Sequence, residues 1–441
     1  MRTLIKNAQI VDPINGYEED GETRDILIED GKFKDIITGS NHGKQNNISA
    51  DKVVDVEGLI LLPGLIDMHT HLREPGFEEK ETIKTGCEAA AAGGFTTVAC
   101  MPNTEPAIDN PATVQYIKSR AKEAVTRVLP IGSITRGREG KELSEIGFLA
   151  GAGVTALSDD GSPVMDSEVM RRAMEYAGDF DMTIIDHCED RTLVKDGVMN
   201  EGYYSTLLGL KPIPAAAEEV IIARDIILAE LTGTPLHIAH LSTAGGLMHL
   251  ERARRKGLDV TAEVTPHHLV LTDEEVKGYN PNTKVNPPLR SREDVESLKE
   301  GLKKGSIDVI ATDHAPHTYE DKLGEFNYAS CGISGLETAL AVIYTHLIEE
   351  DIIDWEKLVE LMCVNPSRIL GKEFSGISRG APADLTVFDP GRKWTVNPAK
   401  FKSKGKNTPF AGWTLEGKPV MTAVDGKIVF DDRGGQNEII Y

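Results

Sequence analysis

Strand-like and helix-like runs alternate between residues 61 and 375, and this alternation limits the fold of the 441-residue chain more than any other feature. The strand-like runs are short and apolar throughout, as strands covered on both faces of a parallel sheet are. Roughly eight such units over about 310 residues predict an α/β fold, a closed (β/α)8 TIM-like barrel rather than an open doubly wound sheet. No G-x-G-x-x-G motif opens the first helix, which argues against a dinucleotide-binding domain.

The two ends of the chain have a different pattern from the middle. Residues 1–60 and 376–441 consist of short strand-like runs separated by turn signals. The pairs Asp30-Gly31 and Asp425-Gly426 each lie between two such runs, which is typical of a β-hairpin. We therefore expect the N- and C-terminal segments to form one small β-sandwich domain beside a barrel made of residues 61–375.

Composition narrows the class of partner. A net charge of −22 argues against binding to nucleic acid or to an anionic membrane, although it leaves room for a small anionic substrate in a locally basic cleft. The five cysteines show no C-x-x-C spacing, and no apolar stretch approaches the roughly 18 residues that a membrane span needs. These features predict a soluble, cytoplasmic protein with reduced thiols.

Histidine and aspartate residues gather at the carboxyl ends of the predicted strands, where the active sites of such barrels lie. The residues at these ends are His69, His71, Asp159, Asp160, His187, His240, Asp313 and His314. Any one of them alone would more often be a hydrogen-bonded surface or turn residue. Because five separate strands end in potential metal ligands, the pattern predicts a metal centre. The histidines that we interpret as structural are His237, His249, His267, His268 and His346.

Four histidines and two carboxylates exceed the three protein ligands of one catalytic zinc ion, so they fit a two-metal site. The predicted ligands of one ion are His69, His71 and Asp313, and those of the other are His187 and His240. Either Asp160 or Asp159 would bridge the two ions. Asp313 could accept a proton from water and pass it to a leaving nitrogen. The residues thus predict metal-dependent hydrolysis, or its reverse, at an amide-like bond.

Four further polar residues follow predicted strands near these ligands: Arg73, Asn103, Asn286 and His317. An arginine can bind a carboxylate through two parallel hydrogen bonds. Together with two amides, the last of which we place at a strand end in "KVNPPLR", it fits a small acidic substrate with amide or ureide groups. A structural alternative stays open, in which Arg73 pairs with Glu74 or Glu78 and the asparagines cap turns.

Eight motifs resemble one enzyme family. They are "GLIDMHTHLREPG", "CMPNTEP", "ALSDDGSPV", "AHLST", "TPHHL", "KVNPPLR", "ATDHAPH" and "GISGLETAL". Their combination closely resembles the bacterial-type dihydroorotases of the cyclic amidohydrolase superfamily, from about residue 3 to the C-terminus. The resemblance implies a zinc-bearing barrel with a small β-domain. It also implies reversible interconversion of N-carbamoyl-L-aspartate and L-dihydroorotate in the de novo synthesis of pyrimidines (UMP).

The resemblance also implies roles for individual residues. His69 and His71 are similar to the ligands of a first zinc ion, and His187 and His240 to those of a second, while Asp313 would be both ligand and catalytic acid/base. The implied substrate contacts are Arg73, Asn103 and His317 at the carboxylate, Asn286 at the ring, His71, and the backbone around Cys331 and Gly332. The residues between His317 and Cys331 resemble a mobile loop over the site.

One departure concerns the bridging ligand. Many relatives bridge their metals with a carboxylated lysine on the fourth strand, but "GVTALSDDG" has no lysine, and Lys141 and Lys195 lie on other elements. The sequence resembles a subgroup in which an aspartate bridges, and we favour Asp160 over Asp159. A shorter bridge leaves open whether one or two zinc ions bind.

The sequence disfavours two alternatives to a dihydroorotase. Another cyclic amidohydrolase, acting on allantoin or hydantoins, is disfavoured by Arg73, by "KVNPPLR" and by the missing lysine. A non-catalytic scaffold for aspartate transcarbamoylase is disfavoured because all ligands are present. A homo-oligomer, or an active complex with aspartate transcarbamoylase, is compatible with the resemblance.

Overall fold

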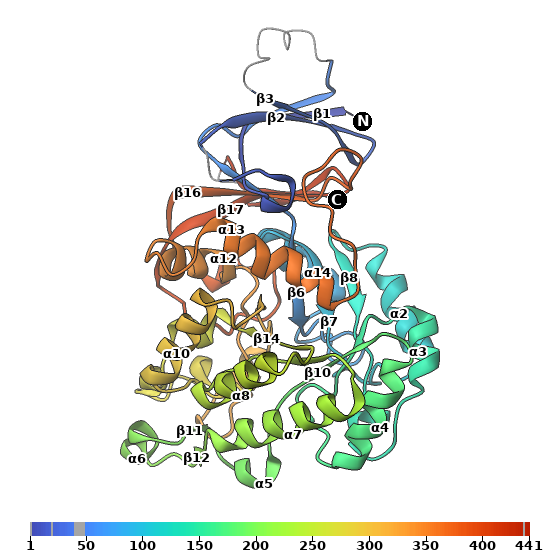
Figure 1. Ribbon diagram of the computed structural model, residues 1–441. Coiled ribbons are helices and arrows are strands. Elements are labelled where there is room, and N and C mark those ends of the chain that lie inside the picture. Colours follow the sequence, from blue (N-terminus) through green and yellow to red (C-terminus); the bar gives the residue numbers. More distant parts are fainter. Residues whose placement is uncertain (1, 19–20, 39–48, 435–436) are drawn as a thin grey trace.

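The computed structural model describes residues 2–18, 21–38, 49–434 and 437–441, and a barrel forms its centre (Figure 1). Its strands are β6 (Leu65–Thr70), β7 (Phe95–Cys100), β8 (Arg127–Pro130), β9 (Ala156–Leu157), β10 (Thr183–Asp186), β13 (Leu236–Ile238), β14 (Val260–Val264) and β15 (Val309–Ile310). They pair in parallel as β6-β7-β8 and β9-β10-β13-β14-β15. Parallel bridges Gly132–Leu157 and Thr70–His314 join the two sheets. The ring is closed, which confirms the predicted barrel.

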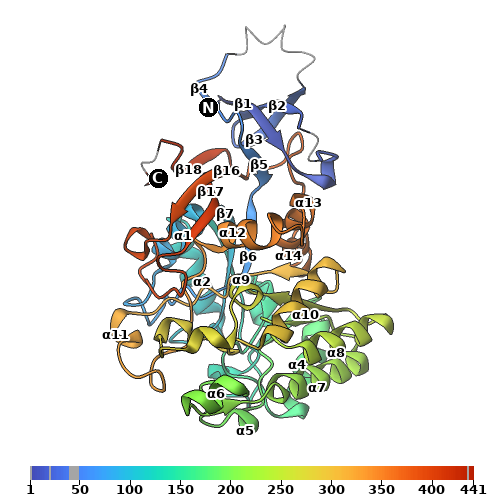
Figure 2. The ribbon, with the colours of Figure 1, turned by 90° about the vertical axis from the view of Figure 1, so that its left-hand side faces the viewer.

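Helices surround the barrel (Figures 1 and 2). They are α1 (Ile83–Ala92), α2 (Pro111–Ala121), α3 (Ile146–Ala152), α4 (Ser167–Gly178), α7 (Ala216–Thr232), α8 (Ala244–Arg255), α10 (Arg292–Lys303), α12 (Ala339–Ile343), α13 (Trp355–Val359) and α14 (Asn365–Ile369). Short polar side chains cap several N-termini: Asp166 accepts from two backbone amides of α4, and Ser291 from one of α10. The inner faces of the helices share one large apolar core with the barrel strands.

Both ends of the chain contribute to a separate sheet of nine strands. Its strands are β1 (Arg2–Ile10), β2 (Thr23–Glu29), β3 (Lys32–Thr38), β4 (Lys52–Asp55), β5 (Ile60–Pro63), β16 (Leu385–Thr395), β17 (Thr414–Val424), β18 (Lys427–Asp431) and β19 (Glu438–Ile439). Strands β5 and β16 pair antiparallel and so join the two ends. In Figure 1 the N-terminal strands lie above β16 and β17, with an apolar core between the layers. The expected small β-sandwich is confirmed, while its boundaries at residues 60 and 376 stay predictions.

The two predicted hairpins are present. Asp30 and Gly31 connect β2 to β3, and Asp425 and Gly426 connect β17 to β18, all four with positive φ. Positive φ at both central positions is the geometry of the tight turn that matches strand twist. The two turns also touch, because a Cβ added at Gly31 would lie 2.9 Å from the carbonyl oxygen of Asp425.

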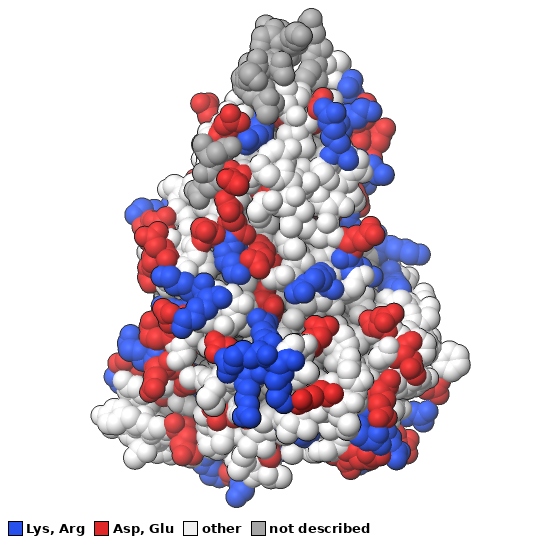
Figure 3. Space-filling view, in the orientation of Figure 1, with Lys and Arg blue, Asp and Glu red and all other residues white. Residues whose placement is uncertain are grey.

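Short elements surround the carboxyl ends of the barrel strands. They are α5 (Arg191–Val194), β11 (Met199–Asn200), α6 (Tyr203–Leu208), β12 (Pro212–Ile213), α9 (Pro266–Val270) and α11 (Tyr319–Lys322). Acidic and basic side chains are interspersed over the face drawn in Figure 3. Within the described part of the chain, no helix combines the length and the apolar character that crossing a membrane requires.

Candidate active site

The predicted metal ligands converge at the carboxyl ends of five barrel strands. His69 lies in β6 and His71 just after it, while Asp160, His187, His240 and Asp313 follow β9, β10, β13 and β15. All six residues are buried, none more than 5% exposed. The ligands form two groups, and within each group the ligand atoms lie within 4.8 Å of one another. One group is His69, His71 and Asp160, and the other is Asp160, His187 and His240, so the groups share Asp160.

Asp160 occupies the centre of the cluster. Its Oδ1 lies 3.3 Å from His69 Nε2 and 3.6 Å from both His187 Nδ1 and His240 Nε2. Its Oδ2 lies 3.6 Å from His71 Nε2. Two ligands bound about 2.0–2.1 Å from the same tetrahedral ion are about 3.4 Å apart. The spacings around Asp160 therefore fit side chains that share a metal ion.

Asp159 faces away from the cluster. Its Oδ1 accepts hydrogen bonds from the backbone amides of Ile134 and Thr135, at 2.8 and 3.1 Å, and its Oδ2 accepts from the Thr135 hydroxyl. Burial raises the pKa of Asp159 to about 6, and the Thr135 bonds oppose that rise. Of the two aspartates that the sequence left open, the structure therefore brings Asp160 to the histidines and uses Asp159 to hold the neighbouring loop.

The cluster contains buried polar atoms whose needs a cation would meet. His69 Nε2 and Asp160 Oδ1 are buried and make no hydrogen bond among the described residues. An unsatisfied buried polar group costs about 1–3 kcal/mol. His187 Nδ1 also lies 2.8 Å from His240 Nε2, and two nitrogen lone pairs approach so closely only when a proton or a cation lies beside them. The donor set fits a metal centre.

Hydrogen bonds orient the first two histidines. His69 Nδ1 donates to the carboxylate of Glu263, and His71 Nδ1 donates to Asn103 Oδ1 at 2.8 Å. These bonds assign the ring protons to Nδ1, which leaves both Nε2 atoms free to bind a metal. Asn103, predicted as a substrate residue, is thus also a partner of His71.

Glu263 is a functional residue that the sequence analysis missed. It lies fully buried in β14, contacts His237 Nε2 at 3.2 Å and accepts from the backbone amide of His240. Burial would raise the pKa of Glu263, but the charge and hydrogen bond of His69 hold it well below its usual range. A carboxylate inside the apolar run "DVTAEVTP" was the available signal.

Asp313 contacts the same cluster from the far side. Its Oδ1 lies 2.9 Å from His71 Nε2 and 3.6 Å from His69 Nε2. Burial would raise the pKa of Asp313, but the contact with His71 Nε2 and the nearby imidazoles of His69 and His71 lower it to about 2. The carboxylate is therefore ionised at neutral pH and able to accept a proton.

A cavity of about 250 Å³ opens over the cluster. Its lining residues are His71, Arg73, Asn103, Asp160, Gly161, His187, His240, Asn286, Asp313, Ala315, His317, Cys331 and Gly332. Every residue predicted to contact substrate is among them. Arg73 Nε donates to the Pro316 carbonyl at 3.3 Å, whereas Glu74 pairs with Arg120 at 2.7 Å. The alternative pairing of Arg73 with Glu74 is therefore not what the structure shows.

Asn286 lies in the cavity, but the prediction that it ends a strand is wrong. It belongs to a loop between α9 and α10. The two prolines that follow it lack the N–H groups that a sheet ladder needs, so the chain cannot continue as a strand there. Asn286 Nδ2 donates to Glu189 Oε1 at 2.9 Å and lies 3.4 Å from His187 Nε2.

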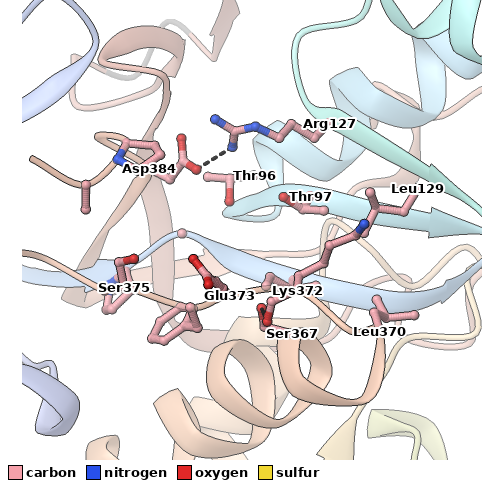
Figure 4. Close-up of a pocket in the computed structure, with 17 residues that line it drawn as sticks. Thr96, Thr97, Arg127, Leu129, Ser367, Leu370, Lys372, Glu373, Ser375 and Asp384 are labelled. Atoms are coloured by element: carbon pink, nitrogen blue, oxygen red, sulfur yellow. Dashed lines mark hydrogen bonds and ion pairs between the residues drawn. The ribbon is translucent and has the colours of Figure 1, made fainter. Parts of the chain in front are cut away.

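Two further features have structural explanations. A third group of potential ligands, Asp186, Cys188 and Asp225, lies behind His187, but Arg224 Nε already donates to Asp225 at 2.8 Å. A second cavity, about 260 Å³, lies at the opposite end of the barrel beside the ion pair of Arg127 and Asp384 (Figure 4). Its lining residues include no histidine or cysteine, so the metal-ligating chemistry belongs to the first cavity.

Comparisons with known proteins agree with this geometry. A Dihydro-orotase-like family model matches residues 58–245. Two curated dihydroorotases are similar over nearly the whole chain. The protein from Caldanaerobacter subterraneus subsp. tengcongensis is 54% identical over 97% of both chains, and that from Syntrophus aciditrophicus is 51% identical over 98% of this chain and 100% of its own.

Among solved structures, the L-hydantoinase (dihydropyrimidinase) from Arthrobacter aurescens superimposes with a TM-score of 0.88. It is 26% identical, and the alignment covers 100% of this chain and 97% of the hydantoinase. The hydantoinase shares the cyclic amidohydrolase fold, while the two curated relatives at 54% and 51% identity are dihydroorotases. The chain belongs to the dihydroorotase family of metal-dependent cyclic amidohydrolases.

Proposed function

We propose that the protein is a zinc-dependent dihydroorotase that interconverts N-carbamoyl-L-aspartate and L-dihydroorotate in pyrimidine synthesis. The observation that carries this proposal is one cavity with two dissimilar walls. We name them the ligand wall (His71, Asp160, His187, His240 and Asp313, with His69 buried beside them) and the substrate wall (Arg73, Asn103, Asn286, His317, Cys331 and Gly332). A metal-ligating wall opposite an arginine fits a cyclic amide that carries a carboxylate.

The ligand wall supplies imidazole nitrogens and carboxylate oxygens, a donor set that suits zinc. In this proposal His69, His71 and Asp313 would hold one ion, His187 and His240 would hold the other, and Asp160 would be a ligand of both. The chemistry that zinc supplies when bound is polarisation of the ring carbonyl and a lowered pKa of water. Because Asp160 is shorter than a carboxylated lysine, occupancy of one or two ions is for experiment to decide.

Asp313 is the proton carrier in this proposal. In the hydrolytic direction, water adds to the ring carbonyl carbon and Asp313 accepts a proton from it. As the carbon–nitrogen bond breaks, Asp313 returns that proton to the ring nitrogen, which leaves as part of the ureide. The carbonyl carbon becomes a carboxyl group, which releases its remaining proton to solvent and is then a carboxylate. Ring closure follows the same path in reverse. The low pKa of the carboxyl group keeps it ready to accept a proton.

The substrate wall orients the acidic ring. Arg73 would bind the substrate carboxylate, assisted by Asn103 and His317. Burial and the nearby charge of Arg73 lower the pKa of His317 to about 3, so its ring is neutral at neutral pH. Arg73 then supplies the positive charge for the substrate carboxylate. Asn286 and the backbone at Cys331 and Gly332, together with His71, would contact the ring.

The test is a comparison of substrates on the zinc-loaded protein. We expect measurable kcat/KM for L-dihydroorotate and at least a hundredfold less for hydantoin, allantoin and uncharged dihydrouracil, because only the first places a carboxylate opposite Arg73. Faster turnover of a neutral ring than of L-dihydroorotate would contradict the proposal and favour a hydantoinase-like activity.

Location and assembly are proposed with it. All five cysteines are free thiols, which suits the cytoplasm, where we place the enzyme. A homo-oligomer, or a complex with aspartate transcarbamoylase, stays a prediction. Analytical ultracentrifugation of the chain, alone and mixed with aspartate transcarbamoylase, would test both.

A further inference from the structure

A C-terminal loop reaches from the small β-domain to the substrate wall. Residues 401–408 lie between the short 3-10 helix Pro398–Lys400 and β17, and they contain the buried side chains of Ser403 and Asn407. Asn407 is 4% exposed and contacts a segment 90 residues earlier in the chain. Gly405 lies so close to Pro316 that an added Cβ would be 2.5 Å from the proline Cβ.

Asn407 uses its whole side-chain amide to connect two segments of the barrel. Its Oδ1 accepts from the His317 backbone amide and from the Ser334 hydroxyl, both at 2.9 Å. Its Nδ2 donates to the carbonyls of Ala315 and Gly332, both at 3.0 Å. The Asn407 carbonyl also accepts from the Ser334 amide at 2.7 Å. An asparagine side chain has two donors and one oxygen acceptor, so every group is used.

The segments that Asn407 connects carry two of the predicted substrate contacts, His317 and Gly332, and contact a third, Arg73. His317 and Gly332 line the cavity, and the Pro316 carbonyl between Ala315 and His317 accepts from Arg73 Nε at 3.3 Å. Gly332 has φ +140°, and a Cβ there would lie 2.7 Å from that of Ala315, so the two segments are tightly packed. The four side-chain bonds of Asn407 go to none of the ligand-wall residues.

We infer that Asn407 is a positioning residue for the substrate wall: it holds the backbone that places Arg73, His317 and Gly332 and so sets the affinity for the acidic substrate. The inference rests on the proposed function. Because misplacing a binding group by about 1 Å can cost a hundredfold, loss of this single amide affects substrate binding without contact with substrate.

The test compares Asn407→Ala with Asn397→Ala in steady-state hydrolysis of L-dihydroorotate. Asn397 is exposed, and its side chain caps the 3-10 helix Pro398–Lys400 by accepting one hydrogen bond, from the Ala399 amide. We expect Asn407→Ala to raise KM at least tenfold while kcat and zinc per chain change less than threefold. Asn397→Ala should leave KM, kcat and zinc content unchanged.

Gly405→Ala is the second variant, and it decides the matter if Asn407→Ala does not fold. It keeps the amide but pushes on Pro316, so it should also raise KM more than kcat. If the wild-type chain turns over L-dihydroorotate, two results would overturn the inference: an unchanged KM in the folded variants, or a fall in their kcat alone. No turnover by the zinc-loaded wild-type chain would instead overturn the proposed function and the inference with it.

Discussion

The ligand wall and the substrate wall differ in how the fold holds them. The ligand-wall residues lie at or just after the ends of barrel strands, so the sheet itself sets their spacing. The substrate-wall residues lie on loops, and side chains from remote segments hold those loops. The barrel architecture therefore positions the proposed metal ligands, whereas the placement of the proposed substrate contacts depends on individual long-range hydrogen bonds.

Lys322 illustrates the second kind of support. Its ammonium group is buried and donates to the carbonyls of Pro281, Lys284 and Ser330, at 3.1, 3.3 and 2.7 Å. Three donors meet three acceptors, two on the loop that leads to Asn286 and one just before Cys331 and Gly332. Together with Asn407, it ties the loop between His317 and Cys331 to the rest of the mouth.

The largest expected effect is at the ligand wall. Asp313→Ala removes the proposed proton carrier, and general acid–base catalysis contributes about 10²–10⁴-fold. We expect kcat for L-dihydroorotate to fall by about 10³-fold or more while some zinc stays bound through His69 and His71. Steady-state kinetics and metal analysis on the same sample check this. Full activity of Asp313→Ala would contradict the acid/base role of Asp313.

Asp160→Asn and Asp159→Asn form a matched pair within the ligand wall. Asp160→Asn should lower zinc per chain and reduce kcat by about 10²-fold, because an amide is a poorer bridging ligand than a carboxylate. Asp159→Asn keeps an oxygen that can accept from Ile134 and Thr135, so zinc content should not change. Loss of zinc in Asp159→Asn alone would reverse the assignment of the bridge.

Glu263→Gln tests the support behind His69. Replacing a partner of a metal-ligating histidine typically costs 10–100-fold in metal affinity or activity. We therefore expect zinc binding to weaken about 50-fold in a chelator competition, with the fold retained because the isosteric amide fills the same buried space. Zinc affinity equal to that of the wild type would remove Glu263 from the metal centre.

The smallest of these effects belongs to the substrate wall. Arg73→Ala should raise KM for L-dihydroorotate about 30-fold, the ratio for about 2 kcal/mol of charge-assisted hydrogen bonding, while zinc content stays constant. Arg120→Ala, which breaks the ion pairs with Glu74 and Glu123 outside the cavity, is the control. An unchanged KM in Arg73→Ala would show that this arginine is structural.

The same division explains what the sequence could predict. The ligand-wall residues were predictable because strand periodicity and the carboxyl-end rule place them together without knowledge of any contact. Glu263 and Asn407 were not, because their roles depend on partners 194 and 90 residues away. Asn286 was predicted for the site and lines the cavity, but its predicted placement at a strand end was wrong because a proline-containing loop carries it.

Titration of the metal-free chain with zinc, with L-dihydroorotate turnover recorded at each step, tests the central claim most directly. The account predicts no turnover without metal, activity that rises with added zinc, and a plateau between one and two equivalents per chain. Full activity without metal, or saturation with zinc and no turnover of L-dihydroorotate, would contradict it.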